Sequence, residues 1–147
     1  MLSDVLNSGA LPTLEAMLRF AGGRQRIIAN NIANATVPGY LQQDVSVTEF
    51  QKTLSKAIEA RREETGGMMG ALQLESTDQV ELGSDGRMTL TPGESPHGGI
   101  LFHDRTNRDM ERLMQDNAEN AGAFRIASEL LRSRMGAIRD AIAERVA

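Results

Sequence analysis

The sequence contains no cysteine and no tryptophan, and its aromatic residues are one tyrosine and four phenylalanines. Without cysteine the chain can form neither a disulfide framework nor a cysteine-based zinc site. Large rings normally supply much of a globular core. A chain of 147 residues, which is the size of one domain, must therefore pack mainly through Leu, Ile, Met and Ala. This composition favours the packing of helix against helix.

Two further absences limit the partners and the location. The formal net charge is −4 and no basic cluster is present, which argues against a nucleic-acid partner. No apolar run approaches the roughly 20 residues needed to cross a bilayer. Residues 1–10 lack the basic start and apolar core of a cleaved signal peptide. We therefore expect a protein that is either cytoplasmic or exported by a route without such a signal.

Signatures of catalysis and ligand binding are also missing. No glycine-rich loop continues into Lys-Ser or Lys-Thr, and no serine lies in a Gly-x-Ser-x-Gly elbow. The two histidines, His97 and His103, lie in a glycine-rich region where plain surface positions are commoner than metal ligands. The acidic residues before Gly86 lack the alternation of a calcium loop. We expect no enzyme activity, no cofactor, no metal and no small-molecule substrate.

A helix is predicted over residues 12–35. Pro12 suits a first-turn position, where its missing N–H costs nothing. Gly22-Gly23 interrupts the helix and allows two interpretations, a locally weak helix or a point of close approach or bending. Positions on one face of the helix alternate in steps of four and three: Leu14, Leu18, Ala21, Gln25, Ile28, Ile32 and Ala35.

A longer helix is predicted over residues 107–146, opened by a capping box at Thr106 and Asp109. Its length would be about 60 Å, whereas a compact domain of this size is only about 40 Å across. The molecule must therefore be elongated, or this helix must find partners in other chains. The same alternating spacing gives a seam of Met110, Met114, Asn117, Ala121, Phe124, Ser128, Leu131, Met135, Ile138 and Ile142.

The middle of the chain differs in kind from the two ends. Ser46 and Glu49 form a capping box that opens a short helix ending near Gly66-Gly67. Residues 72–74 and 87–91 alternate as candidate strands, with a turn at 84–86 between them. We therefore predict a mainly α, elongated fold with long terminal helices in coiled-coil-like packing, and a short helix, small β pieces and flexible loops between them. The corresponding segments are 1–40, 41–104 and 105–147.

Three asparagines, Asn30, Asn31 and Asn34, crowd the end of the first helix just before a Pro-Gly turn. Asparagine is a poor helix former because its amide competes for nearby backbone groups. The cluster could fix a helix end and its exit loop against a partner surface, or it could form an active site, which nothing else in the sequence supports. The first interpretation is therefore preferred.

Both ends carry heptad-like seams, and these seams contain polar residues at Gln25, Asn117 and Ser128. Polar residues in a seam cost stability but specify register and partner number. A chain that holds its neighbours through helical ends forms heterologous contacts, which generate helical arrays. The pattern is typical of a filament subunit.

The run Ala29-Asn30-Asn31-Ile32-Ala33-Asn34, followed by Pro38-Gly39-Tyr40, resembles the N-terminal signature of bacterial flagellar axial proteins, usually written A-N-N-[IL]-A-N-x-x-T-P-G-Y. The chain departs from this signature at Val37, where threonine is usual. Residues 109–120 resemble more loosely the C-terminal pattern of the proximal rod. The short middle region favours the proximal rod over the longer distal-rod and hook proteins, so the chain looks like a basal-body rod protein of the FlgB type.

This resemblance implies a structural subunit of the flagellar basal-body rod, polymerising through its terminal helices into the drive shaft that crosses the periplasm. It implies export by the flagellar type III apparatus without a cleaved signal peptide. The implied partners are other rod proteins, the rod-to-MS-ring junction protein, the membrane ring and further copies of the chain. An alternative is a cytoplasmic helical adaptor or export chaperone, and a small enzyme is a third, less supported possibility.

We expect the assembly interface to comprise one face of each terminal helix together with the signature turn. Leu14, Leu18, Ile28 and Ile32 should form an inner face, met by a facing set near the C-terminus. The full set is Leu14, Leu18, Ile28, Asn30, Asn31, Ile32, Asn34, Pro38, Gly39, Tyr40, Phe124, Leu131, Met135, Ile138 and Ile142.

Overall fold

The computed structural model describes residues 7–83, 86–95 and 110–146, and the rest of the chain lies outside this description. Three helices dominate it and four short strands lie between them. In chain order the elements are α2 (Leu11–Asn34), β1 (Gln43–Asp44), α3 (Val47–Thr65), β2 (Val80–Leu82), β3 (Met88–Leu90), β4 (Gly93–Glu94) and α4 (Met110–Val146).

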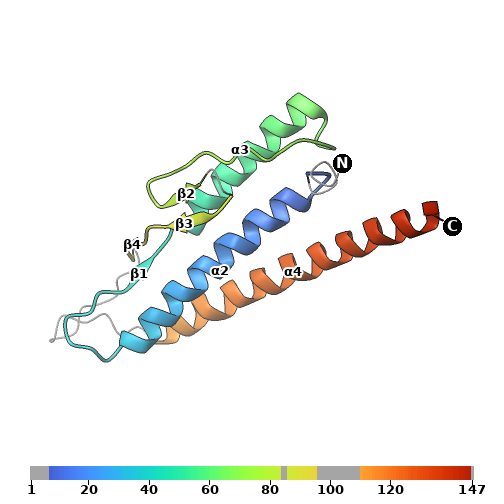
Figure 1. Ribbon diagram of the computed structural model, residues 1–147. Coiled ribbons are helices and arrows are strands. Elements are labelled where there is room, and N and C mark those ends of the chain that lie inside the picture. Colours follow the sequence, from blue (N-terminus) through green and yellow to red (C-terminus); the bar gives the residue numbers. More distant parts are fainter. Residues whose placement is uncertain (1–6, 84–85, 96–109, 147) are drawn as a thin grey trace.

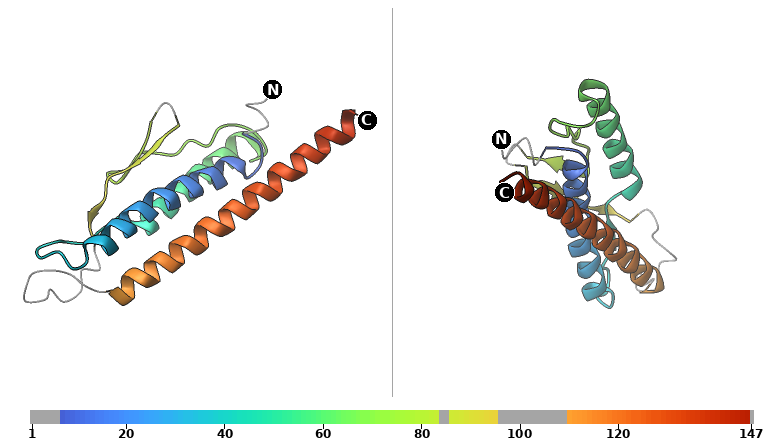
Figure 2. Two further views of the ribbon diagram at one scale, coloured as in Figure 1. Left: turned by 60° about the horizontal axis from the view of Figure 1, so that its bottom comes forward. Right: turned by 90° about the vertical axis from the view of Figure 1, so that its right-hand side faces the viewer.

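α2 lies in the middle of the molecule, with α3 and the short strands on one side and α4 on the other (Figure 1). α4 runs antiparallel to α2 and extends past the beginning of α2, which gives the molecule an elongated outline (Figure 2). With 37 residues against 24, α4 is about 20 Å longer than α2. The predicted mainly α fold, with long terminal helices packed together, a middle helix and small strands, is confirmed.

Local signals fix the helix ends as predicted. α2 begins with Pro12 in its first turn. The Ser46 side chain accepts a hydrogen bond of 3.1 Å from the backbone N–H of Glu49 at the start of α3. That helix ends at Gly66, whose φ of 69° lies in the left-handed region that glycine adopts without a steric penalty. The predicted capping box at Thr106 and Asp109 and the two histidines lie outside the described residues.

The predicted strand at residues 72–74 is wrong. These residues are not in a strand, and β3 pairs instead with β2 in an antiparallel register that places Val80 opposite Leu90 and Leu82 opposite Met88. Leu72 and Leu74 are partly buried against the core. Their alternation therefore reflects the burial of their side chains. The backbone of β3 pairs instead with β2, to which it is joined by the shorter loop.

A second antiparallel pair joins parts of the chain that are distant in sequence. In β1 and β4, Gln43 lies opposite Glu94 and Asp44 lies opposite Gly93. The backbone N–H of Ser95 also donates to the Gln42 carbonyl at 3.0 Å. These contacts fix residues 42–44, which follow α2 in the chain, against residues 93–95.

The apolar core lies between α2, α3 and the β2–β3 pair. The rings of Phe20 and Phe50 stack with their centroids 3.9 Å apart and their planes 3° from parallel. Two of the few aromatic side chains thus join α2 to α3, and burial of each contributes roughly 1.5–3 kcal/mol. The buried cluster consists of Phe20, Val45, Phe50, Leu54 and Val80.

The paired glycines of α2 are contacted from two sides. A Cβ added at Gly23 would lie 2.5 Å from Cδ1 of Leu90 in β3, closer than non-bonded carbons approach, whereas one at Gly22 would lie 3.9 Å from the Phe124 ring of α4. Of the two interpretations left open by the sequence, close approach is confirmed at Gly23. The missing side chain lets the β2–β3 pair lie directly against α2.

Candidate functional site

The asparagine cluster is divided between a buried and an exposed part. Asn31 is only 3% exposed. Its Nδ2 donates to the Gln43 carbonyl at 2.6 Å, and its Oδ1 accepts from the Gln43 N–H at 3.0 Å. One side chain therefore satisfies both backbone groups of Gln43, as a neighbouring strand would. The hydroxyl of Tyr40 donates to the same Oδ1 at 2.8 Å.

Asn30 and Asn34 lie on the outer side of this cluster. Asn34 Nδ2 donates to the carbonyl and to Oδ1 of Asn30, at 2.8 and 3.0 Å, and Asn30 Nδ2 donates to the Tyr40 hydroxyl at 3.2 Å. Burial raises the pKa of the Tyr40 phenol, and the hydrogen bond from Asn30 partly opposes this rise. The hydroxyl therefore remains protonated at neutral pH and can donate to Asn31.

The signature turn brings Tyr40 back to the helix end. Pro38 and Gly39 occupy the two central positions, Gly39 has a φ of 77°, and the N–H of Tyr40 donates to the Val37 carbonyl at 3.2 Å. Proline followed by a glycine of positive φ is the type II turn pattern. Val37 contributes its carbonyl to the turn and its side chain is exposed. Its departure from the usual threonine therefore leaves the turn intact.

Arg24, which no sequence pattern singles out, connects three elements. Its buried guanidinium donates from Nε and Nη2 to the two carboxylate oxygens of Asp44 in β1, at 2.9 and 2.7 Å, and from Nη2 to Asp116 in α4 at 3.4 Å. The hydrogen bonds to Asp44 raise the pKa of Arg24 and outweigh the opposing effect of burial. The one signal in the sequence that could have indicated this buried ion pair is an arginine that lies among the apolar positions of a predicted helix.

Polar side chains also set the register between α2 and α4. Asn120 Nδ2 donates to the Ala21 carbonyl at 2.9 Å and to Oε1 of Gln25 at 2.8 Å. Gln25 Nε2 in turn donates to Oδ1 of Asn117 at 2.7 Å. Gln25 and Asn117, both predicted polar seam positions, are thus brought together, whereas Asn120 lies to one side of the predicted seam and is buried.

A second arginine missed from the sequence holds the other end of α2. The buried Arg61 of α3 donates to the carbonyls of Asn7 and Gly9, at 2.7 and 2.6 Å, and to that of Met69 at 3.3 Å. The N–H of Gly9 donates to the Met68 carbonyl at 3.0 Å. The start of α2 is therefore fixed to the glycine-rich loop after α3.

The two helical faces predicted for assembly differ in burial. On α2, Leu14 and Ile28 are buried and Leu18 and Ile32 are half-buried, so the chain covers most of this face itself. On α4, Leu131 and Ile138 are half-buried, but Phe124, Met135 and Ile142 are 43%, 38% and 55% exposed. Their role in contacts between subunits stays a prediction.

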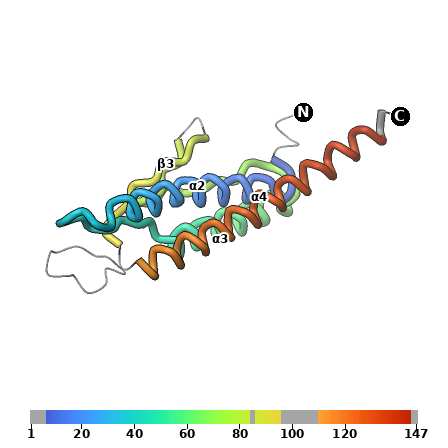
Figure 3. Tube along the Cα trace, turned by 90° about the horizontal axis from the view of Figure 1, so that it is seen from below, coloured from blue at the N-terminus to red at the C-terminus, as the bar shows by residue number. Residues whose placement is uncertain are grey.

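This difference between the helices has a geometric cause. α4 extends past α2 (Figure 3), and its buried residues Leu113, Asn120 and Ala127 lie beside the predicted seam.

The signature-turn residues Pro38 and Gly39 are exposed. Within the ranges that the structure describes, no helix is long and apolar enough to cross a membrane. Nor do these ranges gather three histidine or acidic side chains into a group that could hold a metal ion.

Comparison with known proteins assigns the stretch that contains the asparagine cluster. The family model described as flagella basal body rod protein matches residues 23–40, which include Arg24, Asn31 and Tyr40. The chain is also 31% identical over 139 residues to the flagellar basal body rod protein FlgB of Salmonella typhimurium (strain LT2), and the match covers 85% of this chain and 91% of that protein. The chain therefore belongs to the family of flagellar basal-body rod proteins.

Proposed function

We propose that this protein is a structural subunit of the proximal rod of the flagellar basal body. The observation that carries the proposal is the similarity to a rod protein along most of the chain, including the residues that hold the end of α2. In this role the fold has to present a surface that binds other subunits. It needs no reaction chemistry, and we propose neither a cofactor nor a small-molecule substrate.

The apolar side chains that stay exposed on α4 support polymerisation through the terminal helices. Large apolar residues follow one side of this helix, and several of them remain exposed in the single chain. Contiguous exposed apolar surface is typical of a site of protein association. We propose that the exposed residues Phe124, Met135 and Ile142 contact neighbouring subunits in the rod, and that the signature turn lies beside this contact.

We further propose the neighbours of the subunit in the rod and its route of export. Other rod proteins, the rod-to-MS-ring junction protein and the membrane ring are the proposed neighbours of a subunit in the proximal rod. The flagellar type III apparatus is the proposed route of export to the periplasm, without a cleaved signal peptide. The alternative, a cytoplasmic adaptor or export chaperone, would form a closed oligomer and remain inside the cell.

Deletion of the gene from the source bacterium tests the proposal. We expect loss of hook and filament while the membrane ring is still assembled, and recovery of motility when the wild-type chain is supplied. Basal bodies isolated from the complemented strain should contain the chain. Normal flagella in the deletion strain, or a chain found only in the cytosol, would contradict the proposal.

A further inference from the structure

A groove with a volume of about 550 Å³ runs between α2, α3 and α4. α2 lies at its base, and α3 and α4 border it on either side. Its apolar lining comes mostly from α2 and α3, and its charged lining mostly from α4. The residues that define it best are Met17 and Phe20 at the base, Gln51 and Leu54 on α3, and Glu119 and Ala123 on α4.

The shape of this groove suits one further helix. Helices pack against each other with side chains of one filling the spaces between side chains of the next. Here three helices already provide a base and two walls, and a fourth would complete a bundle. On α4 the groove extends from Arg112 to Ala123. That distance corresponds to about 16 Å of helix.

The second half of α4 provides a segment of matching length. Leu131, Met135, Ile138 and Ile142 follow one side of the helix at steps of four, three and four, and they also span about 16 Å. Met135 and Ile142 are exposed. A straight helix cannot fold back into a groove bordered by its own first half, so this segment can fill only the groove of another molecule.

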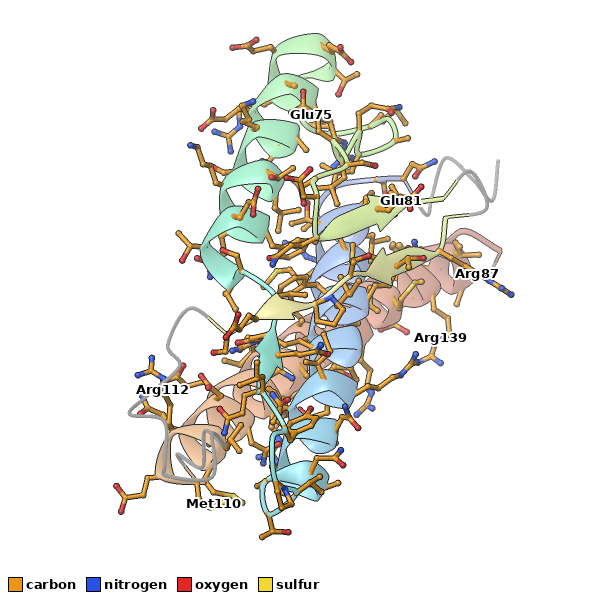
Figure 4. The ribbon with its side chains drawn as sticks, turned by 90° about the vertical axis from the view of Figure 1, so that its left-hand side faces the viewer. Glu75, Glu81, Arg87, Met110, Arg112 and Arg139 are labelled. Atoms are coloured by element: carbon orange, nitrogen blue, oxygen red, sulfur yellow. The ribbon has the colours of Figure 1, made fainter. Side chains whose placement is uncertain are left out.

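The charges of groove and segment have opposite signs. The groove residues include two arginines, Arg24 and Arg112, and three acids, Asp44, Asp116 and Glu119, which leaves one net negative charge. Residues 131–142 contain three arginines and one aspartate, which leaves two net positive charges. Arg112 and Arg139 mark the two halves of α4 in Figure 4. Complementary charge of this kind favours encounter and correct register more than affinity.

We propose that the groove between α2, α3 and α4 receives residues 131–142 of a second copy of this chain. The donated segment and the groove lie on different parts of the molecule, so each copy can donate and receive at once. Such a heterologous contact can repeat from copy to copy, and it extends into a helical array when the rotation between copies does not close a ring. The inference rests on the proposed rod function and specifies which surfaces meet.

Paired cysteines test this contact in the assembled basal body. The natural chain has no cysteine, so every disulfide comes from the introduced residues. Gln51→Cys places a thiol on the α3 wall near the middle of the groove, and Met135→Cys places one near the middle of the donated segment. Both positions are exposed. The positions can be linked only when their Cα atoms are within about 7 Å.

The control carries Lys56→Cys with Met135→Cys. Lys56 lies on α3 too, but outside the groove, with its Nζ 3.4 Å from Glu75. Each variant is first checked for motility in the deletion strain. After mild oxidation of isolated basal bodies, we expect disulfide-linked multimers of the chain from the Gln51/Met135 pair and at least tenfold less from the Lys56/Met135 pair.

Each other outcome is decisive. The groove assignment is wrong if motile cells yield basal bodies that contain the chain but link the Gln51/Met135 pair no better than the control. A link to a different protein would exclude a second copy as the occupant, and a link formed by Met135→Cys alone would indicate symmetric pairing of α4. Absence of the wild-type chain from basal bodies would instead contradict the proposed function itself.

Discussion

Asn30 and Asn31 are neighbours in the sequence with opposite environments. Asn31 is buried and holds both backbone groups of Gln43, whereas Asn30 is exposed and contacts Tyr40 from outside. Composition located the cluster but could not divide it, because the division depends on a strand that lies 12 residues further along the chain. Asn31 therefore acts inside the subunit, and the role of Asn30 in contacts between subunits stays a prediction.

Replacing these two asparagines should have unequal effects. Asn31→Ala removes a buried side chain together with its hydrogen bonds to Gln43 and Tyr40, so we expect a loss of about 2–4 kcal/mol in the free energy of unfolding. Asn30→Ala should cost less than about 1 kcal/mol. Urea unfolding followed by circular dichroism measures both, and equal losses would contradict the proposed division.

The ionisation of Tyr40 should make the free energy of unfolding depend on pH. Burial raises its folded pKa above the ordinary value of 10.0, so the protonated phenol stabilises the fold below pH 10, and this contribution is lost as the pH rises through the folded pKa. We expect the free energy of unfolding to fall above about pH 10 more steeply in the wild type than in Tyr40→Phe. Identical slopes would exclude this role.

At the scale of elements, the sequence predicts well wherever its signals are local. The ends of α3 follow from Ser46, Glu49 and Gly66, which lie within or next to the helix itself. The prediction of a strand at 72–74 is wrong because alternating burial does not reveal backbone pairing, and β3 pairs with the nearer segment 80–82. Arg24 is missed for a different reason, since its partners Asp44 and Asp116 lie 20 and 92 residues away. Alternating spacing indicated two apolar faces, but not how far α4 would extend past α2.

The glycine pair of α2 gives a prediction with its own control. Gly22→Ala should stabilise the protein by up to about 1 kcal/mol, because alanine favours the helix and its Cβ meets Phe124 at an ordinary distance. Gly23→Ala gains the same propensity but forces Leu90 to move, which costs about 1–3 kcal/mol. Urea midpoints compare the two variants, and we expect Gly23→Ala to be clearly the less stable. Equal stabilisation would show that β3 does not press on α2.

At the scale of the whole molecule, the subunit combines an apolar core with a helix–helix contact that is partly polar. α2, α3 and the β2–β3 pair enclose the apolar core, whereas the contact between α2 and α4 includes hydrogen bonds of Gln25, Asn117 and Asn120. Polar contacts specify register more than they add stability. α4 can therefore be aligned within the subunit and still present apolar side chains to others.

An exposed position on α4 separates assembly from folding. Ile142 is 55% exposed, so Ile142→Asp should leave the helix content and unfolding midpoint of the purified chain within about 0.5 kcal/mol of the wild type. In cells of the deletion strain we expect it to abolish motility. Ala143→Asp adds the same charge at the neighbouring exposed residue and should support swimming. Normal motility of Ile142→Asp would exclude this face from the assembly interface.

Asn31 has one more effect, which concerns the growth of sheets. An unpaired strand edge is a template on which another chain can add a strand and so begin an aggregate. β1 pairs with β4 along one edge, and the side chain of Asn31 occupies the backbone groups of Gln43 along the other. The sheet is terminated at this residue by a side chain that cannot propagate it. The rod subunit that we propose, which polymerises through helices, is in this way protected at β1 from polymerising through strands.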